Sequence, residues 1–97
     1  MNIKHAQYML TVMQEGSITA AAKKLYISQP SLSQMIKLVE NNLGTAIFNR
    51  STDPITLTYA GEKYIEAAKQ ILTINNNLQK EIDEIIPDSF GSTLILT

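Results

Sequence analysis

Side chains that form paired hydrogen bonds are concentrated between residues 28 and 37. Glutamine carries an N–H donor beside a C=O acceptor and can pair bidentately with N6 and N7 of adenine, while a serine hydroxyl donates or accepts at either base. A proline ring offers an apolar surface to a thymine methyl group. On composition alone, a solvated helix face with two capping serines is the simpler interpretation, so the surrounding elements must decide. The candidate base-contacting set is Gln29, Pro30, Ser31, Ser33, Gln34 and Lys37.

Residues suited to bind phosphate lie around this set. Ser28 and the first backbone N–H groups after it would form an anion site at a helix start. Arg50 is a candidate for a phosphate or for the minor groove, and its alternative is a structural ion pair with Glu40. Further candidates, each with a merely solvated side chain as the alternative, are Thr19, Lys23 and Lys24.

Two capping residues place the base-contacting set on the second of two consecutive helices. Ser17 precedes a short segment with apolar residues at helical spacing, which ends just before Ser28. Ser28 is a second N-cap, and Pro30 falls in the first turn, where its missing N–H breaks no intrahelical bond. Gly44 supplies the left-handed residue that ends this helix. The pattern predicts a helix-turn-helix over residues 18–37, whose second helix enters the major groove of DNA.

The flanking segments complete a small helical domain. Apolar residues recur at helical spacing before the motif, and Gly16 ends that first helix. Residues 46–50 and 55–57 are rich in β-branched or aromatic residues and predict a hairpin, a wing that leans on the helices through Phe48 and Leu57. The predicted fold class is mainly α, a winged helix-turn-helix with three helices and a two-stranded wing. The apolar faces expected on the first and third helices are Ala6, Met9, Leu10 and Met13, and Leu32, Met35, Ile36, Val39 and Leu43.

A long segment follows Thr58 without a proline until Pro87. Its apolar residues recur at steps of three and four, close to a heptad repeat. A helix of about 27 residues is roughly 40 Å long, whereas a domain of about 60 residues is only some 20–25 Å across, so the helix must project. Its apolar stripe then lacks cover within the chain, which predicts a homodimer. The predicted dimerisation residues are Tyr64, Ala67, Ile71, Ile74, Leu78, Ile82 and Ile85.

Composition argues against several classes of function. The chain has 97 residues, no cysteine and a net charge of −1, with basic residues in excess over residues 1–65 and acidic residues in excess thereafter. The lack of cysteine removes disulfides and thiolate metal sites, and His5 has no second ligand nearby, so no metal or other cofactor is expected. No catalytic triad, glycine-rich phosphate loop or pair of buried carboxylates can be assembled, so we expect no enzyme. No apolar run approaches the roughly 20 residues that span a bilayer, so no membrane association and a cytoplasmic location are expected.

Six short segments occur in a specific order and spacing. They are Glu15-Gly16-Ser17, Ala21-Ala22-Lys23-Lys24-Leu25, Ser28-Gln29-Pro30-Ser31-Leu32-Ser33, Leu43-Gly44, Phe48-Asn49-Arg50 and Leu57-Thr58-Tyr59-Ala60-Gly61. Together they resemble the N-terminal domain of LysR-type transcriptional regulators over nearly the whole chain. The resemblance implies a winged helix-turn-helix DNA-binding domain at 1–58 and a linker helix at 59–86 that pairs two subunits. It also implies that 87–97 begin a truncated two-lobed effector domain, with Gly91–Thr97 as its first strand.

Some positions depart from the family pattern. Gln34 stands where many relatives have arginine, and Met35 stands where glutamine is common. Asp53-Pro54 occupies a part of the wing that often carries a basic residue. The departures at Gln34 and at Asp53-Pro54 remove positive charge from the face expected to meet DNA.

The sequence therefore predicts a sequence-specific regulator that binds double-stranded DNA as a homodimer on an interrupted palindrome. A higher oligomer would be possible in the full-length protein, and a small-molecule effector would bind only through the missing C-terminal domain. The alternative is a winged-helix module for protein interaction and oligomerisation that does not read DNA. Salt dependence separates the two, since only a DNA binder releases counterions from phosphates.

Overall fold

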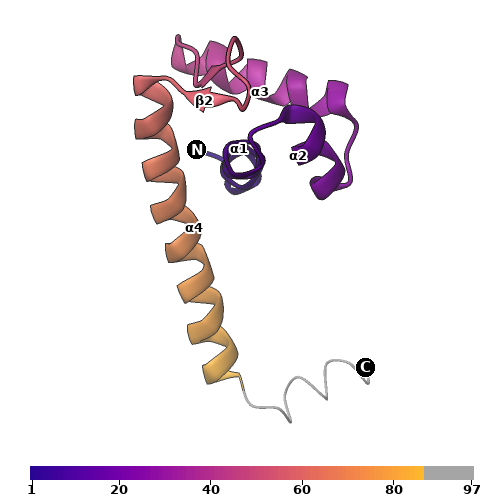
Figure 1. Cartoon of the computed structure of the whole chain (residues 1–97). Coiled ribbons are helices and arrows are strands. Elements are labelled where there is room, and N and C mark those ends of the chain that lie inside the picture. Colours follow the sequence, from indigo (N-terminus) through magenta and orange to yellow (C-terminus); the bar gives the residue numbers. More distant parts are fainter. Residues whose placement is uncertain (87–97) are drawn as a thin grey trace.

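The computed structural model of the chain describes residues 1–86 (Figure 1). Its elements are α1 (Ile3–Glu15), α2 (Ile18–Leu25), α3 (Gln29–Leu43), β1 (Phe48–Asn49), β2 (Thr56–Leu57) and α4 (Tyr59–Ile85). The predicted mainly α fold, with three helices, a two-stranded wing and a long final helix, is confirmed. The strand expected at Gly91–Thr97 and the domain expected to begin at residue 87 lie outside the described residues.

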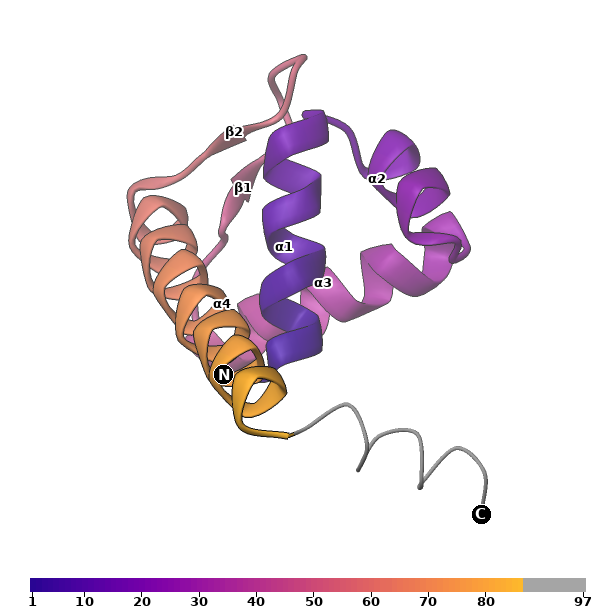
Figure 2. The ribbon, with the colours of Figure 1, turned by 90° about the horizontal axis from the view of Figure 1, so that it is seen from below.

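Helix α1 forms the centre of the domain. Figure 2 shows α2 on one side of α1, α4 on the other, and α3 crossing behind it. Packing between α1 and α2, between α2 and α3, and between α1 and α4 links the helices to one another. This arrangement leaves the outer side of α3 free of any other helix (Figure 1).

Local capping sets the ends of the helices, as the sequence predicts. The hydroxyl of Ser17 accepts a hydrogen bond from the N–H of Ala20 at 3.1 Å, and the hydroxyl of Ser28 accepts one from the N–H of Ser31 at 3.2 Å. Gly16 and Gly44 end α1 and α3 with φ values of 67° and 77°, a conformation that side chains with a Cβ rarely adopt.

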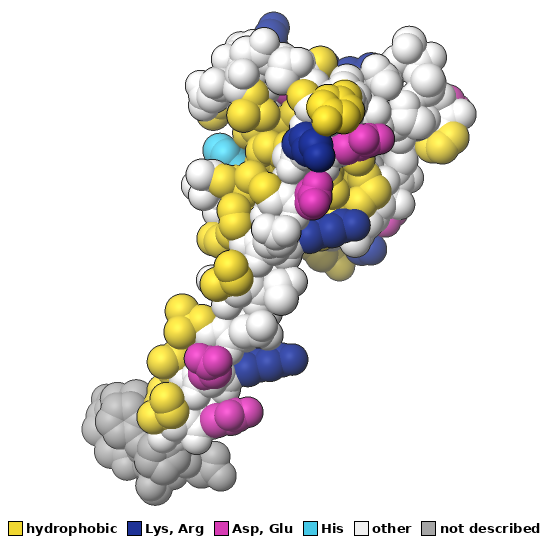
Figure 3. Space-filling model, turned by 90° about the vertical axis from the view of Figure 1, so that its left-hand side faces the viewer, with side chains coloured by type: hydrophobic (Ala, Val, Ile, Leu, Met, Phe, Trp, Pro, Cys, Tyr) yellow, Lys and Arg dark blue, Asp and Glu magenta, His cyan; other side chains and the backbone are white. Residues whose placement is uncertain are grey.

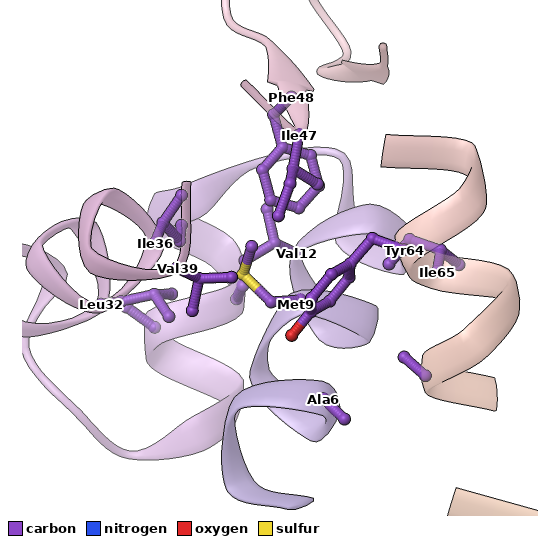
Figure 4. Packing of buried hydrophobic residues seen from close by; sticks show 13 residues of the cluster. Ala6, Met9, Val12, Leu32, Ile36, Val39, Ile47, Phe48, Tyr64 and Ile65 are labelled. Atoms are coloured by element: carbon purple, nitrogen blue, oxygen red, sulfur yellow. The ribbon is translucent and has the colours of Figure 1, made fainter. Parts of the chain in front are cut away.

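The core gathers side chains from all four helices and the wing around Met9 (Figure 4). Val12, which the sequence pattern did not single out, is fully buried, whereas Leu10 and Met13 only pack against the edge of the core. The expectation that Leu43 lies on the buried face is wrong, because this last residue of α3 extends past the core and is 51% exposed. The buried residues are Ala6, Met9, Val12, Ala21, Ala22, Leu32, Ile36, Val39, Ile47, Phe48, Tyr64, Ile65 and Ala68.

The wing is a short antiparallel hairpin. Phe48 pairs with Leu57, and Asn49 pairs with Thr56. As predicted, the hairpin leans on the helices through Phe48, which is buried, and Leu57, which is half-buried. The paired strands are shorter than the predicted segments 46–50 and 55–57, because residues 50–55 form the turn rather than extending the ladder.

Helix α4 carries two apolar rows. One row, Gly61, Ile65, Ala68 and Leu72, packs within the chain and was not predicted from the helical spacing. The other is the stripe that was predicted to lack cover. At about 100° of rotation per residue, the two rows lie roughly a quarter of a turn apart.

Tyr64 lies between these rows, and the prediction that it lacks cover within the chain is wrong. Its side chain was expected on the uncovered stripe, but it is 8% exposed and packs in the core of its own chain, next to Met9 (Figure 4). Its hydroxyl has no hydrogen-bond partner among the described residues. Burial raises the pKa of this hydroxyl above its ordinary value. Intramolecular packing therefore covers the start of the predicted stripe.

Candidate nucleic-acid interface

The N-terminal half of α3 presents most of the predicted base-contacting residues on one open side. Leu32 and Ile36 anchor this helix in the core, so the residues on its other side turn outward. Ala21 and Ala22 are buried on α2, where their small side chains let the two helices cross closely. Gln29, Pro30, Ser31, Gln34 and Lys37 are exposed, and Ser33 is half-buried.

Hydrogen bonds already order part of this surface. Nε2 of Gln29 donates to the hydroxyl of Ser33 at 2.8 Å, and the hydroxyl of Ser28 donates to that of Ser31 at 2.7 Å. No such bond joins Gln34 or Lys37 to another side chain within residues 1–86. The carbonyl oxygen and the second N–H of the Gln29 amide, and the whole amide of Gln34, are thus available to an incoming molecule.

The candidate phosphate-binding residues lie at three places. Thr19 and Lys23 are exposed at opposite ends of α2. Lys24 is also exposed, but its Nζ lies 3.4 Å from a carboxylate oxygen of Glu15. Ser28 caps the start of α3, where free N–H groups and the helix dipole favour an anion. Arg50, the third place, lies at the wing.

Arg50 makes the structural ion pair with Glu40 that was the predicted alternative to a DNA contact. Nη2 of Arg50 lies 3.1 Å from Oε1 of Glu40, and the Arg50 side chain remains 47% exposed. The second oxygen of Glu40 accepts hydrogen bonds from the backbone N–H groups of Ile47 at 2.7 Å and Phe48 at 3.4 Å. The carboxylate of Glu40 therefore connects α3 to the base of the wing as well as to Arg50.

Tyr26 is an exposed residue that the predicted interface did not include. It closes α2 in the left-handed conformation with φ 58°, which is unusual for a bulky side chain, and it is 95% exposed. The break in the apolar pattern after Leu25 was its signal in the sequence. Its backbone N–H donates to the carbonyl oxygen of Lys23 at 3.2 Å, which fixes the turn that leads to Ser28.

Two hollows border α3. One, of about 570 Å³, lies between the second half of α3 and the wing, and polar residues line much of it. The other, of about 420 Å³, lies between α1, α3 and α4 and is lined by Met1, His5, Val39, Leu43 and Tyr64 among others. Within residues 1–86 no cluster of potential metal ligands occurs, and no helix has the length and apolarity needed to cross a membrane.

Beyond the domain, α4 exposes an apolar surface. Figure 3 shows hydrophobic side chains as a band along one side of α4, continuous with the hydrophobic surface beside the histidine. Ile74 is 68% exposed and Ile85 is 74% exposed, whereas Ala67 and Ile71 are partly covered. Large apolar side chains in a continuous exposed row mark an interaction surface. The exposed part of the predicted stripe comprises Ile74, Leu78, Ile82 and Ile85.

Comparison with known proteins gives consistent matches. Residues 3–62 match the family model of bacterial regulatory helix-turn-helix proteins of the lysR family. The chain is 36% identical over 96 residues to the HTH-type transcriptional regulator BsdA of Bacillus subtilis, covering 98% of this chain and 33% of BsdA. The chain spans between about a quarter and about a half of the length of the curated relatives it matches.

Solved structures give the same result. The structure of the BenM DNA-binding domain with catB site 1 DNA matches with a TM-score of 0.82 and 32% identity, covering 88% of this chain and 96% of that one. The CbnR DNA-binding domain in a DNA complex matches with a TM-score of 0.80 and 30% identity, covering 90% of this chain and all of that one.

Proposed function

This chain belongs to the LysR family of bacterial regulatory helix-turn-helix proteins, and from that premise we propose that it is a sequence-specific reader of double-stranded DNA. Residues 1–58 form the reading domain, 59–86 the dimerisation helix, and 87–97 the start of a further domain. The observation that carries the proposal is the open, polar N-terminal half of α3, capped by Ser28 and anchored by Leu32 and Ile36. The DNA complexes of the BenM and CbnR domains, which share this fold, support it.

Recognition follows from the side chains on α3. The helix enters the major groove, where Gln29 and Gln34 pair with adenine and Ser31 and Ser33 bond to base edges. Pro30 contacts a thymine methyl group. Lys37 instead contacts phosphate, and the remaining base-contacting residues include no arginine or lysine, so guanine is not expected to dominate the preferred sequence.

Phosphate contacts fix the position of the domain on the duplex. They come from Thr19, Lys24, Lys37 and Arg50, together with the N–H groups at the start of α3 beside Ser28. These contacts carry no sequence information themselves, but they supply most of the salt-dependent affinity.

The exposed stripe of α4 pairs two copies. Ala67 and Ile71 lie as far before the point between Ile74 and Asn75 as Ile82 and Leu78 lie after it. The rows therefore match when the two helices run antiparallel, with Ile71 against Leu78 of the second copy. That register also brings the partner's apolar helix end to the hollow bordered by Met1 and Leu43.

Charge favours the antiparallel arrangement over the parallel one. Glu81, Asp83 and Glu84 lie near the end of α4. Parallel pairing would place two such acidic ends side by side, whereas antiparallel pairing brings each to the start of the other copy's α1, which carries Lys4. The two reading domains then lie apart, as an interrupted palindrome requires.

The chain's lack of cysteine makes this register directly testable. Ala67→Cys and Ile82→Cys should cross-link to each other when the two variants are mixed, and neither should cross-link to itself. Self-linking of Ile82→Cys at high yield would instead indicate parallel helices.

In the proposed function the chain has no catalytic role, acts in the cytoplasm and responds to a small-molecule effector only through a domain beyond residue 86. The relative BsdA is a transcriptional regulator, which supports the absence of a catalytic role in this proposal. The competing function is an oligomerisation module that does not bind DNA. Its only support among the described residues is the exposed stripe of α4, which the proposed function also explains.

A binding experiment separates these functions. Duplexes selected from a random pool serve as the probe, and affinity is measured over a range of salt. If about 3 to 5 phosphates are neutralised per subunit, log K should fall with log[salt] with a slope near −5 to −9 for the dimer. A slope indistinguishable from zero would leave only the oligomerisation module.

Base reading is tested with single-base variants of the selected duplex. Gln29→Ala and Gln34→Ala should each cost about 1 to 3 kcal/mol and relax the preference at one base pair per half-site. The matched control is Lys24→Ala, which should weaken binding to all sequences alike. Uniform loss for the glutamine variants, or a much lower melting temperature, would rule out this face as the reader.

A further inference from the structure

The hollow between α3 and the wing continues the polar side of the recognition helix. Gln29, Ser33, Lys37 and Asn41 follow one another at intervals of four residues, so they form one row along α3. Lys37 and Asn41 line the hollow, together with Thr45 and Arg50 from the far side. The row therefore leads from the base-reading half of α3 directly to a second cluster of hydrogen-bond donors.

The donors around the hollow suit a phosphate group. Lys37 and Arg50 are cations, and Asn41 and Thr45 add neutral donors. Glu40 contributes the one carboxylate among the lining residues, which leaves one net positive charge. The hollow is open to solvent and adjoins the polar row of α3 that the proposed function turns toward DNA, so a phosphodiester of the duplex can enter it.

Glu40 determines where Arg50 lies at this hollow. Its side chain is only 12% exposed, and its position is fixed by the hydrogen bonds to the N–H groups of Ile47 and Phe48. A carboxylate held in this way orients the guanidinium that it binds. Arg50 keeps donors free, because a guanidinium has five N–H groups and Oε1 of Glu40 accepts from one nitrogen.

We propose that this hollow is a phosphate-binding site for the DNA backbone beside the bases read by α3, and that Glu40 is the residue that positions Arg50 at its rim. The inference rests on the proposed function and extends it to Asn41, Thr45 and Glu40. Pre-ordering of Arg50 lowers the conformational entropy lost when the phosphate binds. It also fixes the wing contact relative to the recognition helix, since Glu40 belongs to α3 and Arg50 directly follows β1.

The probe is the duplex selected from a random pool, made in versions with a single uncharged methylphosphonate in place of one phosphate. For the parent chain, one such replacement per half-site should weaken binding at the position that meets the hollow. Arg50→Gln should lower the affinity for the unmodified duplex about tenfold and reduce the salt slope of the dimer by about 2. The methylphosphonate at that position should then have no further effect.

Glu40→Gln tests the positioning role. The glutamine carbonyl can still accept from Ile47, but its amide meets Arg50 with a donor, so the pair is lost while the charge of Arg50 remains. The variant should lose the effect of the same methylphosphonate, and the double variant with Arg50→Gln should bind no worse than Arg50→Gln alone. Glu66→Gln, which removes an exposed carboxylate on α4, is the matched control and should keep the effect.

Several outcomes would overturn the inference. If every methylphosphonate weakens binding by Arg50→Gln as much as binding by the parent, the hollow is not a phosphate-binding site. If Glu40→Gln binds more tightly with a steeper salt slope, Glu40 only neutralises Arg50. In either case Gln34→Ala would still relax the base preference. If the proposed function itself fails, Gln34→Ala would have no effect on base preference.

Thermal melting shows whether Glu40→Gln remains folded at the temperature of the binding assay. If it does not, Arg50→Lys decides, because it leaves Glu40 and its backbone hydrogen bonds in place. A single ammonium paired with Glu40 cannot present the fork of donors that Arg50 offers, so the variant should lose the phosphate contact although its charge is kept. Parental affinity and slope for Arg50→Lys would overturn the positioning role.

Discussion

The two apolar rows of α4 differ in what covers them. Gly61, Ile65 and Ala68 pack on the domain of their own chain, and Ile65 is only 3% exposed. Ile74 and Leu78 belong to the other row and are 68% and 55% exposed. Both rows have helical spacing and both are apolar, so the difference lies in their surroundings rather than in their pattern.

Periodicity therefore identifies an apolar face but not the molecule that covers it. The heptad-like row was recognisable because it contains large residues over most of α4. The covered row is short and includes Gly61 and Ala68, whose small side chains allow close approach but contribute little to a hydrophobic pattern. Substitutions in the two rows should therefore have separable effects, on folding in one case and on association in the other.

The largest effect is expected in the covered row. Ile65→Asp would place an unpaired carboxylate in the core and should cost about 4 kcal/mol or more, enough to unfold a domain of this size. Loss of helical circular dichroism and of cooperative urea unfolding is the measurement. A folded variant with an unchanged urea midpoint would break the distinction between the rows.

The same substitution in the exposed row should leave the fold intact. Leu78→Asp would bury a carboxylate only in the dimer, so we expect sedimentation as a monomer, with dimerisation weakened about 100-fold or more. The matched control is Asn76→Asp, which adds the same charge on the opposite side of α4 and should remain dimeric. If Leu78→Asp and Asn76→Asp sediment alike as dimers, the exposed row is not the interface.

Gly61 belongs to the covered row and lies where α4 meets the wing. A Cβ at this position would collide with the carbonyl oxygen of Ile47. Gly61→Ala should cost about 1 to 2 kcal/mol, because overpacking outweighs the gain in helix propensity. Gln70→Ala, on the exposed surface of the same helix, should change the free energy of unfolding by less than about 0.5 kcal/mol. Equal stability of the two variants would show that the contact relaxes freely.

The smallest effect concerns Tyr64, between the two rows. Because its buried hydroxyl has no partner among residues 1–86, Tyr64→Phe should leave stability unchanged or raise it by up to about 1 kcal/mol. Burial raises the pKa of this hydroxyl, so the folded state favours its protonated form. The free energy of unfolding is therefore unaffected by this group below the ordinary tyrosine pKa of about 10, and it falls as pH rises through the folded-state pKa.

Urea unfolding at two pH values checks this prediction, in a Leu78→Asp background so that a single chain is measured. The alkaline loss of stability should be smaller for Tyr64→Phe than for its parent. An identical loss in both would mean that Tyr64 does not contribute to it.

Much of the fold was predictable because local chemistry determines it. Ser17, Ser28 and Thr58 cap helices through hydrogen bonds that span three residues, and Gly16 and Gly44 end helices by their own conformation. The position of Leu43 was not predictable in the same way. Whether the last turn of a helix lies over the core depends on where the core ends, which helical spacing does not record.

The candidate interface shows the same division. The outward side of α3 follows from its buried side, so Gln29 and Gln34 were placed from the sequence alone. The roles of these side chains toward DNA stay predictions. Of the two interactions of Glu40, only the ion pair with Arg50 was predicted. The hydrogen bonds from the N–H groups of Ile47 and Phe48 could not be, because backbone N–H groups are not distinguished by residue type.

The join between the wing and α4 has a mechanical consequence. The hydroxyl of Thr58 donates to the carbonyl oxygen of Ala46 at 2.6 Å and accepts from the N–H of Gly61 at 2.9 Å, and the N–H of Thr58 donates to Ile47 at 2.9 Å. These bonds hold the start of α4 against the stem of the wing, and the packing of Ile65, Ala68 and Leu72 on the domain holds the rest of its first half. Only the second half of α4, roughly 20 Å long at 1.5 Å per residue, projects as a lever arm, and a sideways displacement of about 3.5 Å at its far end corresponds to a tilt of about 10°.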